Sequence, residues 1–524
     1  MFLKYVRKTT KENKVSTYLY IAESYRVGKK VRQRAWYLGR LEKNRASLVK
    51  ITEKLITLLK GDFISTGKDL LFKEAKEFGP SYIFRRLWEA SGMKEQFRKI
   101  TEAEGLSFDL GEAIFEMVLN RLAEPLSKRG MFLRWREGQY LNGKEEPLQL
   151  HHYYRALDHL SMHIEEIEDS LWKEKDQLFG PEVRLVFFDT TSSYFEGEGP
   201  SGLAAYGFSK DHRPERKQIV IVVAMREDGL PLMHKIFEGS KADVSSFKEV
   251  SLEVKRRFGI KEAIVVADRG CVSEDIIKGL SEAGLGYILG ARLRTYEARE
   301  ALSSPGRYRK VSQNLKVKEV SIRGRRYIVC LNEEEAKRQK HERGEILKTL
   351  EEKLKGGAKS LIANKGYRKY LKAKGEGFEI DRQKAEAEAG YDGKWVIITN
   401  TTLSTESAAL SYKRLWEVER AFRDLKNVLE IRPIYHWSER RVRGHIGVCF
   451  LALYLQRLFM KKLDGAGLEI SWGEVIWELR QIKAGHFRAQ NSGDEFWMRT
   501  ELSEKGKSLF KALKMAFPMR VWKR

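Results

Sequence analysis

The chain has 524 residues, too many for one hydrophobic core, so we expect two to four domains. Hydrophobic residues make up 42% of the sequence, which excludes a disordered chain. There are 98 Lys and Arg residues against 73 Asp and Glu residues, a formal net charge of +25. This charge is compatible with a polyanionic partner such as nucleic acid, and equally with an ordinary, highly charged surface.

The sequence shows no sign of export, membrane insertion or structural zinc. It has only three cysteines, widely spaced and without a C-x-x-C pair: Cys271, Cys330 and Cys449. This excludes a zinc ribbon and a disulfide framework and favours a reducing compartment. Residues 1–8 lack the apolar core of a signal peptide, and the most apolar helix, residues 447–460, is interrupted by Gln456 and Arg457. We expect a soluble, cytoplasmic protein without a membrane partner.

The first part of the chain predicts β-structure and then helices. In residues 1–45, the segments 17–21 and 31–36 flank a turn at 27–30, which is typical of a hairpin. Its alternating basic residues make one face a candidate DNA contact, although an ordinary half-exposed hairpin has the same pattern. Residues 46–175 follow a helical period, and we interpret them as a helical DNA-end-binding region. The apolar residues that recur at helical spacing are Phe84, Leu87, Trp88, Ile114, Phe115, Val118, Leu119 and Leu122.

Short β-rich runs then replace the helical period. They cover residues 185–188, 219–225, 232–237, 263–267 and 287–289, with a helix at 247–258 between the third run and the fourth. Three strands, a helix and another strand is the order of an RNase H-like core, an α/β fold with a mixed sheet flanked by helices. We assign the first part of this core to residues 181–294.

The remaining chain is divided by composition and period. Residues 295–400 contain a basic hairpin at 317–329, a charged helix at about 333–354 and a strand at 395–399, which predicts a β-rich domain inserted into the core. Residues 401–460 are helical and are assigned as the second part of the core. The tail, residues 461–524, is predicted to be helical and basic.

Two aspartates follow apolar strands. Asp189 comes after residues 185–188, and Asp268 comes after residues 264–267. A carboxylate at the end of a buried strand loses hydration unless a cation or hydrogen bonds compensate it. A single such aspartate is usually a turn residue. Two of them on neighbouring strands would meet at one edge of the sheet, which favours a shared site.

A third acid is expected on a helix of the second core segment. We choose Glu419 over Glu417, because Tyr412, Glu419 and Lys426 are spaced by seven residues and would project from nearly one helical face. A solvated charged face is the alternative. Three carboxylates without His or Cys partners suit Mg²⁺, with Mn²⁺ as a substitute. Two such ions catalyse in-line phosphoryl transfer without a nucleophilic side chain.

Several motifs across the chain resemble one known family. They are Asn120-Arg121-Leu122 with Pro125 and Ser127-Lys128, Tyr154 to Leu157, Phe188 to Thr191, Tyr206 to Asp211, Ala267 to Gly270, Leu415 to Arg423 with Leu425-Lys426, and Arg432 to His436. Together they resemble DDE transposases of bacterial insertion sequences, in the group with a β-rich insertion before the catalytic Glu. The resemblance implies an RNase H-like catalytic core and cut-and-paste transposition. It also implies a homodimer in a synaptic complex on double-stranded DNA, with element ends and target DNA as substrates.

The family's signature Tyr, Arg, Glu and Lys correspond to Tyr412, position 415, Glu419 and Lys426. Position 415 is Leu here, so Arg414 or Arg423 is the candidate to supply the missing charge. The resemblance implies that Lys426 grips DNA phosphate beside the active site. We therefore predict catalysis and metal binding by Asp189, Asp268 and Glu419. The predicted DNA-binding residues are Tyr412, Arg414, Arg423, Lys426, Arg440, Arg441 and Arg443.

Alternatives remain for parts of this assignment. Arg440, Arg441 and Arg443 have the pattern of phosphate contacts and equally of a solvated face. His234 lacks partners at metal-ligand spacing, so a structural role is expected. For the whole protein, the alternatives are an RNase H-like nuclease without strand transfer and a DNA-binding protein without catalysis. The expected location is the cytoplasm, with association with the nucleoid during action.

Overall fold

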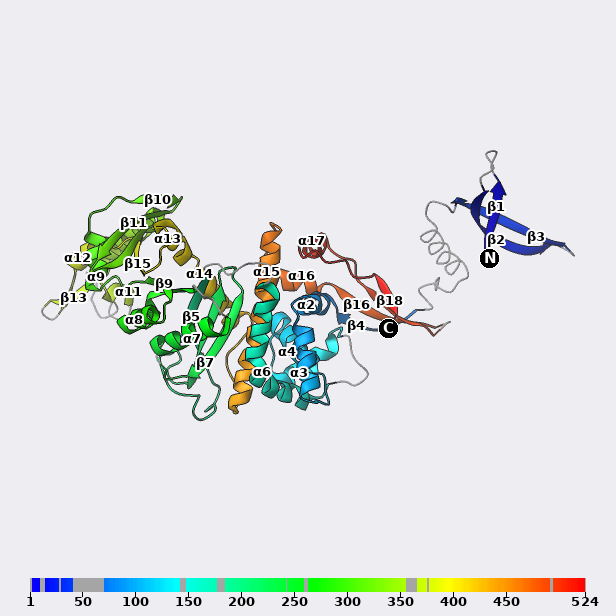
Figure 1. Ribbon diagram of the computed structural model, residues 1–524, viewed down its shortest axis with the longest axis horizontal. Coiled ribbons are helices and arrows are strands. Elements are labelled where there is room, and N and C mark those ends of the chain that lie inside the picture. The colour runs from blue at the N-terminus through cyan, green and yellow to red at the C-terminus, as the bar shows by residue number, and fades with distance from the viewer. Residues whose placement is uncertain are drawn as a thin grey trace.

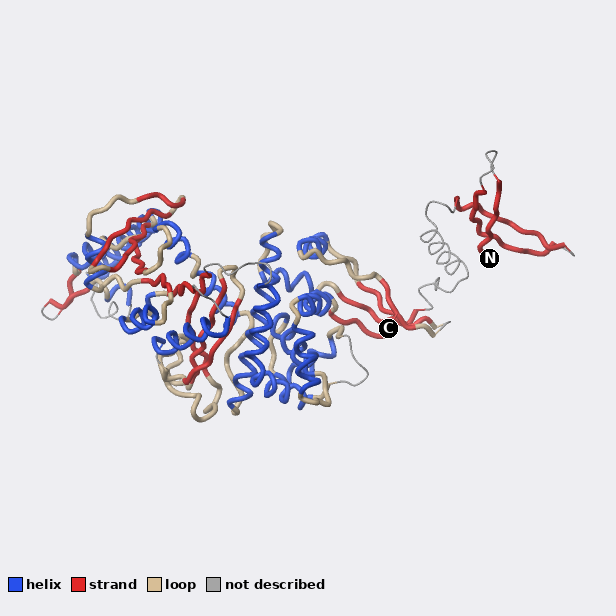
Figure 2. Tube along the Cα trace, in the orientation of Figure 1, coloured by secondary structure: helices blue, strands red, loops and turns tan. Residues whose placement is uncertain are grey.

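The computed structural model describes residues 2–9, 15–27, 30–40, 70–141, 148–176, 184–241, 243–258, 263–354, 365–374, 377–490 and 493–523. Figures 1 and 2 show that the helical region lies between the large central sheet and a smaller sheet near the C-terminus. None of the helices in these described ranges combines the length and the apolar character needed to cross a bilayer.

The N-terminal segment forms a three-stranded antiparallel sheet. Its strands are β1 (Phe2–Thr9), β2 (Val15–Val27) and β3 (Lys30–Arg40), in the order β1-β2-β3. The pairing of β2 with β3 extends to Val27 and Lys30, which confirms the predicted hairpin. The turn residues Gly28 and Lys29, and residues 46–69 of the predicted helical region, lie outside the described residues.

The helical region buries the apolar residues that the period singles out. Its helices are α2 (Gly79–Ala90), α3 (Met93–Ala103), α4 (Leu110–Ala123), α5 (Lys128–Gly130) and α6 (Leu150–Asp176), with the π-helical η2 (Met131–Trp135) and the 3₁₀ turn η3 (Arg136–Gly138). All eight apolar residues that recur at this period are buried, so the helical interpretation is confirmed for them. Asp109 caps α4 by accepting a hydrogen bond from the backbone N–H of Glu112 at 3.0 Å.

Two predictions for the flanks of this region are wrong. The strand β4 (Leu70–Glu77) lies within the segment predicted as helical, and the C-terminal tail is only partly helical. The tail contains α16 (Trp472–Arg480), β16 (Lys483–Ala489), β17 (Glu495–Arg499), α17 (Glu504–Ala512) and β18 (Val521–Lys523). The four strands form one sheet in the order β18-β17-β16-β4. In β16 the buried Ala484 and His486 alternate with more exposed residues, which is a strand period.

The central sheet has the strand order expected for an RNase H-like core. The core strands are β5 (Arg184–Tyr194), β6 (Gln218–Arg226), β7 (Pro231–Glu238), β8 (Ala263–Ala267) and β9 (Gly286–Gly290). They run in the order β7-β6-β5-β8-β9. Strands β5, β8 and β9 are parallel to one another, and β6 is antiparallel to both of its neighbours, β5 and β7. The helices α7 (Asp243–Phe258) and α8 (Glu274–Glu282) follow β7 and β8. The predicted strand-strand-strand-helix-strand order is confirmed.

The segment predicted as an insertion extends this sheet. Strands β15 (Lys394–Thr399), β12 (Arg325–Leu331), β11 (Leu315–Ile322) and β10 (Arg309–Ser312) continue from β9, so the sheet has nine strands. The other elements are α9 (Tyr296–Ser303), α10 (Glu333–Leu354), α11 (Lys365–Arg368), β13 (Leu371–Lys374), β14 (Gly377–Ile380) and α12 (Arg382–Ala389). Because β15 pairs with β9, the segment shares its sheet with the core. The domain boundaries stay a prediction.

Three helices return the chain to the core: α13 (Thr405–Lys413), α14 (Trp416–Asn427) and α15 (Glu439–Gly465). α14 packs against β5, and α15 packs against α6 and β7. At Gly444 a Cβ atom would lie 2.1 Å from the carbonyl oxygen of Leu157, so only glycine allows α15 to approach α6 this closely. His234 lies beside α6, and its ring contacts Glu168 at 2.9 Å, which confirms its structural role.

Candidate active site

The register of the central sheet brings the backbones of the two predicted aspartates together. β5 and β8 are parallel neighbours, and Phe188 pairs with Ala267. Asp189 and Asp268 are the next residues, so their backbones lie side by side where β8 ends, about 5 Å apart. The sequence predicts that the strand ends before Asp189. In the structure β5 continues through Asp189, and its pairing with β6 extends to Tyr194. The side chain of Asp189 lies outside the described residues.

Tyr412 holds the carboxylate of Asp268. The phenol O–H of Tyr412 donates a hydrogen bond to Asp268 Oδ1 at 2.9 Å. Burial and the nearby Asp268 charge raise the pKa of Tyr412, so the hydroxyl stays protonated and keeps its role as donor. Asp268 is half-buried, and no further hydrogen bond or ion pair of its carboxylate occurs among the described residues. One carboxylate oxygen is therefore oriented by Tyr412, and the other remains for a ligand.

A glycine makes room for this contact. A Cβ atom at Gly290, at the end of β9, would lie 2.2 Å from the Tyr412 hydroxyl and 3.0 Å from the ring carbon that bears it. The sequence analysis did not single out Gly290. Its role depends on the packing of β9 against α13, which no local pattern reveals.

Glu419 lies on α14, the helix packed against β5, and its side chain is exposed. The prediction that Tyr412 and Glu419 share one continuous helix is wrong, because Tyr412 belongs to α13. Between the two helices the backbone N–H of Leu415 donates to the carbonyl oxygen of Tyr412 at 3.0 Å, a tighter turn than an α-helix makes. Glu419 and Lys426 do share α14.

Lys426 lies in a buried ion-pair cluster that the sequence did not predict. Its ammonium is 2.6 Å from Asp211 Oδ1, and the same oxygen accepts a hydrogen bond from Arg432. Side-chain exposure is 14% for Lys426 and 2% for Asp211, so this carboxylate is shielded from water. Burial lowers the pKa of Lys426, and the Asp211 charge opposes that shift. Asp211 Oδ2 is buried and has no hydrogen-bond partner among the residues that the structure describes.

Lys210 connects this cluster to the catalytic strand. Its ammonium donates to the carbonyl oxygen of Thr190 at 2.7 Å, and its backbone N–H donates to the Ser192 hydroxyl at 2.9 Å. Thr190 directly follows Asp189. The motifs that contain Lys210, Asp211 and Arg432 are part of the family resemblance, but the sequence assigned them no role.

Comparisons with family models identify the family of the chain. The family model described as "Transposase DDE domain" matches residues 181–455, more than half of the chain. The chain is a DDE transposase. A second family model, "IS1634 family transposase, N-terminal domain", matches residues 3–65 and confirms an insertion-sequence transposase. The protein therefore binds DNA and catalyses its cleavage and strand transfer, and its family uses divalent metal ions.

The transposase is also similar to solved transposase complexes. A piggyBac transposase synaptic complex with hairpin DNA is 11% identical, with 77% of this chain and 79% of that chain covered and a TM-score of 0.36. A pre-cleavage Mos1 transpososome is 13% identical and covers 47% of this chain and 68% of that chain, with a TM-score of 0.15. A Mos1 transposase paired-end complex with the left transposon end is 13% identical and covers 47% of this chain and 69% of that chain, with a TM-score of 0.15. Among curated proteins, none matches the chain.

Two of the predicted DNA-binding arginines of this transposase lie in or near α14. Arg414 lies in the turn before α14 and donates to the backbone oxygen of Glu227. Arg423 is exposed on α14, four residues after Glu419 and therefore on the same face. Position 415, where the family has Arg, holds a Leu that is buried in the core.

The other three arginines lie in the first turns of α15. Arg440 is exposed, Arg441 is 3.6 Å from Asp158, and Arg443 is 2.8 Å from Glu439. These exposed or half-exposed ion pairs contribute little to stability, so they can be exchanged for phosphate contacts at low cost. Their role in DNA binding stays a prediction.

The donor chemistry fits a hard divalent cation. Asp268 offers a carboxylate oxygen, Glu419 is exposed, and the Asp189 backbone adjoins that of Asp268. Among the side chains that the structure describes, no three His, Cys, Asp or Glu residues form a metal-binding group. Because the Asp189 side chain is not among them, the complete trio stays a prediction.

Proposed function

We propose that the transposase performs cut-and-paste transposition with Asp189, Asp268 and Glu419 as the ligands of two Mg²⁺ ions. The observation that supports this most strongly is the register of β5 and β8, which makes two aspartates neighbours at the point where β8 ends. When bound, the two ions would activate a water or a 3′-hydroxyl and stabilise the leaving 3′-oxygen. Mn²⁺ has the same preference for oxygen ligands and is expected to substitute.

The residues around these carboxylates have positioning roles in this proposal. Tyr412 fixes the direction in which Asp268 presents its second oxygen, since its hydrogen bond occupies the first. Lys426 is held by Asp211 at a buried position. We assign it to a backbone phosphate of the strand being cut, so that the scissile bond is placed rather than chemically activated.

Arg423 is the better candidate to replace the signature arginine. It is exposed and one helical turn from Glu419, whereas Arg414 is bonded to a backbone oxygen near the β6–β7 turn. Arg440, Arg441 and Arg443 would contact phosphates further along the same DNA. The excess positive charge of the chain, +25, supports binding that weakens steeply with salt.

The remaining parts of the proposal concern assembly. We assign recognition of the terminal inverted repeats to the helical region, residues 46–175, and a supporting DNA contact to the N-terminal sheet. Two element ends must be joined in one reaction, so a homodimer on paired ends is proposed. We assign the reaction to the cytoplasm, at the nucleoid, where DNA is the substrate.

The test is an assay of cleavage and strand transfer on duplex DNA that carries the element ends, in Mg²⁺. Asp189→Ala, Asp268→Ala and Glu419→Ala are each expected to abolish both reactions while binding of the same DNA is retained. Glu417→Ala is the matched control, since it removes a carboxylate from the same helix, and it should cleave. Cleavage by a ligand variant would exclude that residue from the site. Cleavage without strand transfer by the wild type would identify a nuclease.

A further inference from the structure

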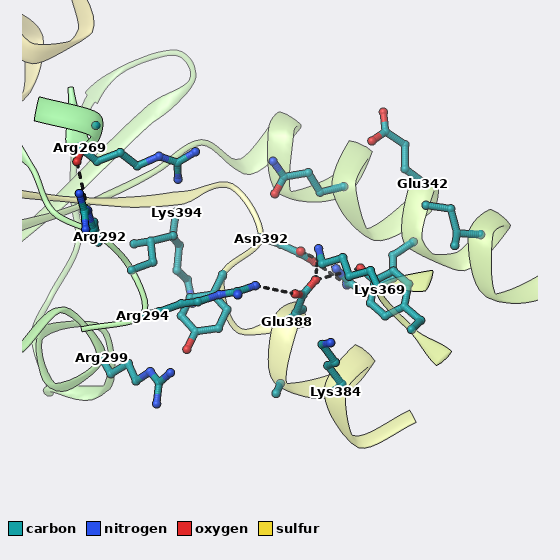
Figure 3. A pocket seen from close by; sticks show the side chains of 18 residues that line it. Arg269, Arg292, Arg294, Arg299, Glu342, Lys369, Lys384, Glu388, Asp392 and Lys394 are labelled. Atoms are coloured by element: carbon teal, nitrogen blue, oxygen red, sulfur yellow. Dashed lines mark hydrogen bonds and ion pairs between the residues drawn. The ribbon is translucent and has the colours of Figure 1, made fainter. Parts of the chain in front are cut away.

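A second basic site lies directly beside the catalytic sheet. A hollow of about 1240 Å³ separates the core from the segment that extends its sheet (Figure 3). The 3₁₀ turn η4 (Arg269–Cys271) contributes Arg269 to one wall, and the loop after β9 contributes Arg292. The opposite wall comes from α10 and α12. Because Arg269 follows Asp268 in the chain, this hollow begins one residue from a predicted metal ligand.

The lining of the hollow is strongly positive. Eight of its residues are Lys or Arg and three are Asp or Glu, which leaves an excess of five positive charges. Arg343 neutralises Asp392 through two hydrogen bonds of 2.5 and 2.6 Å. Glu388 is shared, because it pairs with Lys369 and lies 3.4 Å from Arg294 (Figure 3). Asp392 and Glu388 therefore pair with cations of the walls, and the excess positive charge of the lining remains for a ligand.

Within the described ranges, three cations of the lining have side chains without a hydrogen bond or ion pair, namely Arg269, Arg299 and Lys384. Arg299 on α9 and Lys384 on α12 are exposed, and their side chains form no ion pair or hydrogen bond within the described ranges. In Figure 3 neither carries a dashed line, in contrast to the paired Arg294 and Lys369. Unpaired cations on elements that converge on one hollow are typical of a site for an anionic ligand.

We propose that this hollow binds an unpaired DNA strand next to the catalytic carboxylates, with phosphate contacts from Arg292, Arg299 and Lys384. The volume exceeds the 300–1,000 Å³ or so of ordinary small-molecule pockets, so it has room for more than one nucleotide. The half-buried Tyr391 in the lining offers a ring on which a base can stack. A positive groove with aromatic side chains is the chemistry of single-strand binding.

The proposal rests on the transposase function, and its experiment is separable from the test of catalysis. The probe is a fluorescein-labelled dT₁₅ oligonucleotide, titrated with full-length protein by fluorescence anisotropy without Mg²⁺. The test variant is Arg299→Glu with Lys384→Glu. The matched control is Lys340→Glu with Lys348→Glu, which makes the same change of net charge on α10 at exposed positions that do not line the hollow. Both variants are first compared with the wild type by circular dichroism and thermal melting.

We expect the test variant to weaken binding of dT₁₅ about tenfold or more and the control variant to change it less than about twofold. Losing two phosphate contacts should also reduce the slope of log K against log salt by about 1.4. Equal losses in both variants, or no loss in the test variant, would overturn the proposal.

Competition with an unlabelled duplex of the same length tests the choice of ligand. Unlabelled single-stranded DNA should displace the labelled dT₁₅ from the hollow at lower concentration than the duplex does. A duplex that competes equally would contradict single-strand binding. None of these outcomes depends on Asp189, Asp268 or Glu419, so failure of the catalytic proposal would be seen separately in the cleavage assay.

Discussion

Two basic regions of this transposase flank the predicted catalytic carboxylates and differ in how their charges are held. Around Asp211, the cations of Lys426 and Arg432 are largely buried and share one carboxylate oxygen. In the hollow beside η4, Arg299 and Lys384 are exposed and unpaired within the described chain. Buried, paired cations keep a fixed position, whereas exposed cations attract a ligand and adapt to it. We infer that the first region positions DNA and the second recruits it.

The largest expected effect is the loss of the carboxylate that organises the buried cluster. Asp211→Ala leaves Lys426 and Arg432 as uncompensated cations, and removing one partner from such a buried pair costs about 3–5 kcal/mol. Urea denaturation should therefore show a much lower free energy of unfolding. Asp275→Ala, an exposed aspartate on α8, is the control and should change it little. If both variants change the free energy of unfolding equally little, the cations around Asp211 are no more tightly held than the exposed cations of the hollow.

A second prediction concerns the contact between Tyr412 and Asp268. Gly290→Ala places a methyl group 2.2 Å from the Tyr412 hydroxyl, so the ring must move away from Asp268. Misplacing a catalytic group by about 1 Å can reduce the rate about 100-fold, and we expect a loss of that order in DNA cleavage. DNA affinity should change much less than the cleavage rate, because the main clash is with Tyr412, and the contact with the backbone nitrogen of Arg269, at 3.0 Å, is milder.

The double variant Gly290→Ala with Tyr412→Phe distinguishes a displaced Tyr412 hydroxyl from a general disruption of the fold. Without the hydroxyl the main clash is relieved, so its cleavage rate should be close to that of Tyr412→Phe alone. Gly344→Ala, where a Cβ meets nothing within 4 Å, is the control. Additive losses in the double variant would refute a positioning role for Gly290.

The smallest expected effect concerns a buried cation beside another cation. Burial, together with a smaller contribution from the neighbouring Arg121 charge, lowers the pKa of Lys128 to about 7. Because the ordinary pKa of a lysine is 10.5, the unfolded state binds more protons than the folded state between about pH 7 and 10.5. The contribution of Lys128 to stability is therefore unfavourable at neutral pH and improves as the pH rises.

Lys128→Met should raise the free energy of unfolding at pH 7 by about 1 kcal/mol or more. Its advantage over the wild type should shrink between pH 7 and pH 10, as measured by urea denaturation at each pH. A constant difference across this range would show that the Lys128 side chain is not desolvated in the folded protein.

The parts of the fold that the sequence predicted are those that local patterns determine. The apolar runs of β5 to β9 and the helical period of α2 to α6 depend on neighbouring residues, and both are found in the structure. The adjacency of Asp189 and Asp268 followed from two strands ending in acids, together with a parallel arrangement of those strands. Glu419 is chosen over Glu417 from its seven-residue spacing to Tyr412 and Lys426, and the family resemblance agrees with that choice.

The remaining features depend on contacts between distant residues. β4 pairs with β16 from the other end of the chain, so no window around residues 70–77 contains its partner. Tyr412 and Asp268 are 144 positions apart, and Lys426 and Asp211 are 215 apart. The seven-residue spacing from Tyr412 to Glu419 predicted one helix, but the tight turn at Leu415 divides it.

The central claim is that Asp189, Asp268 and Glu419 together bind the catalytic metal ions, and a titration of Mn²⁺ followed by electron paramagnetic resonance tests it most directly. The wild-type transposase, bound to duplex DNA that carries the element ends, should bind two Mn²⁺ ions per catalytic site. Asp189→Ala, Asp268→Ala and Glu419→Ala should each lose at least one ion, and Glu417→Ala should keep both. Two ions bound with unchanged affinity in all three ligand variants would contradict the claim.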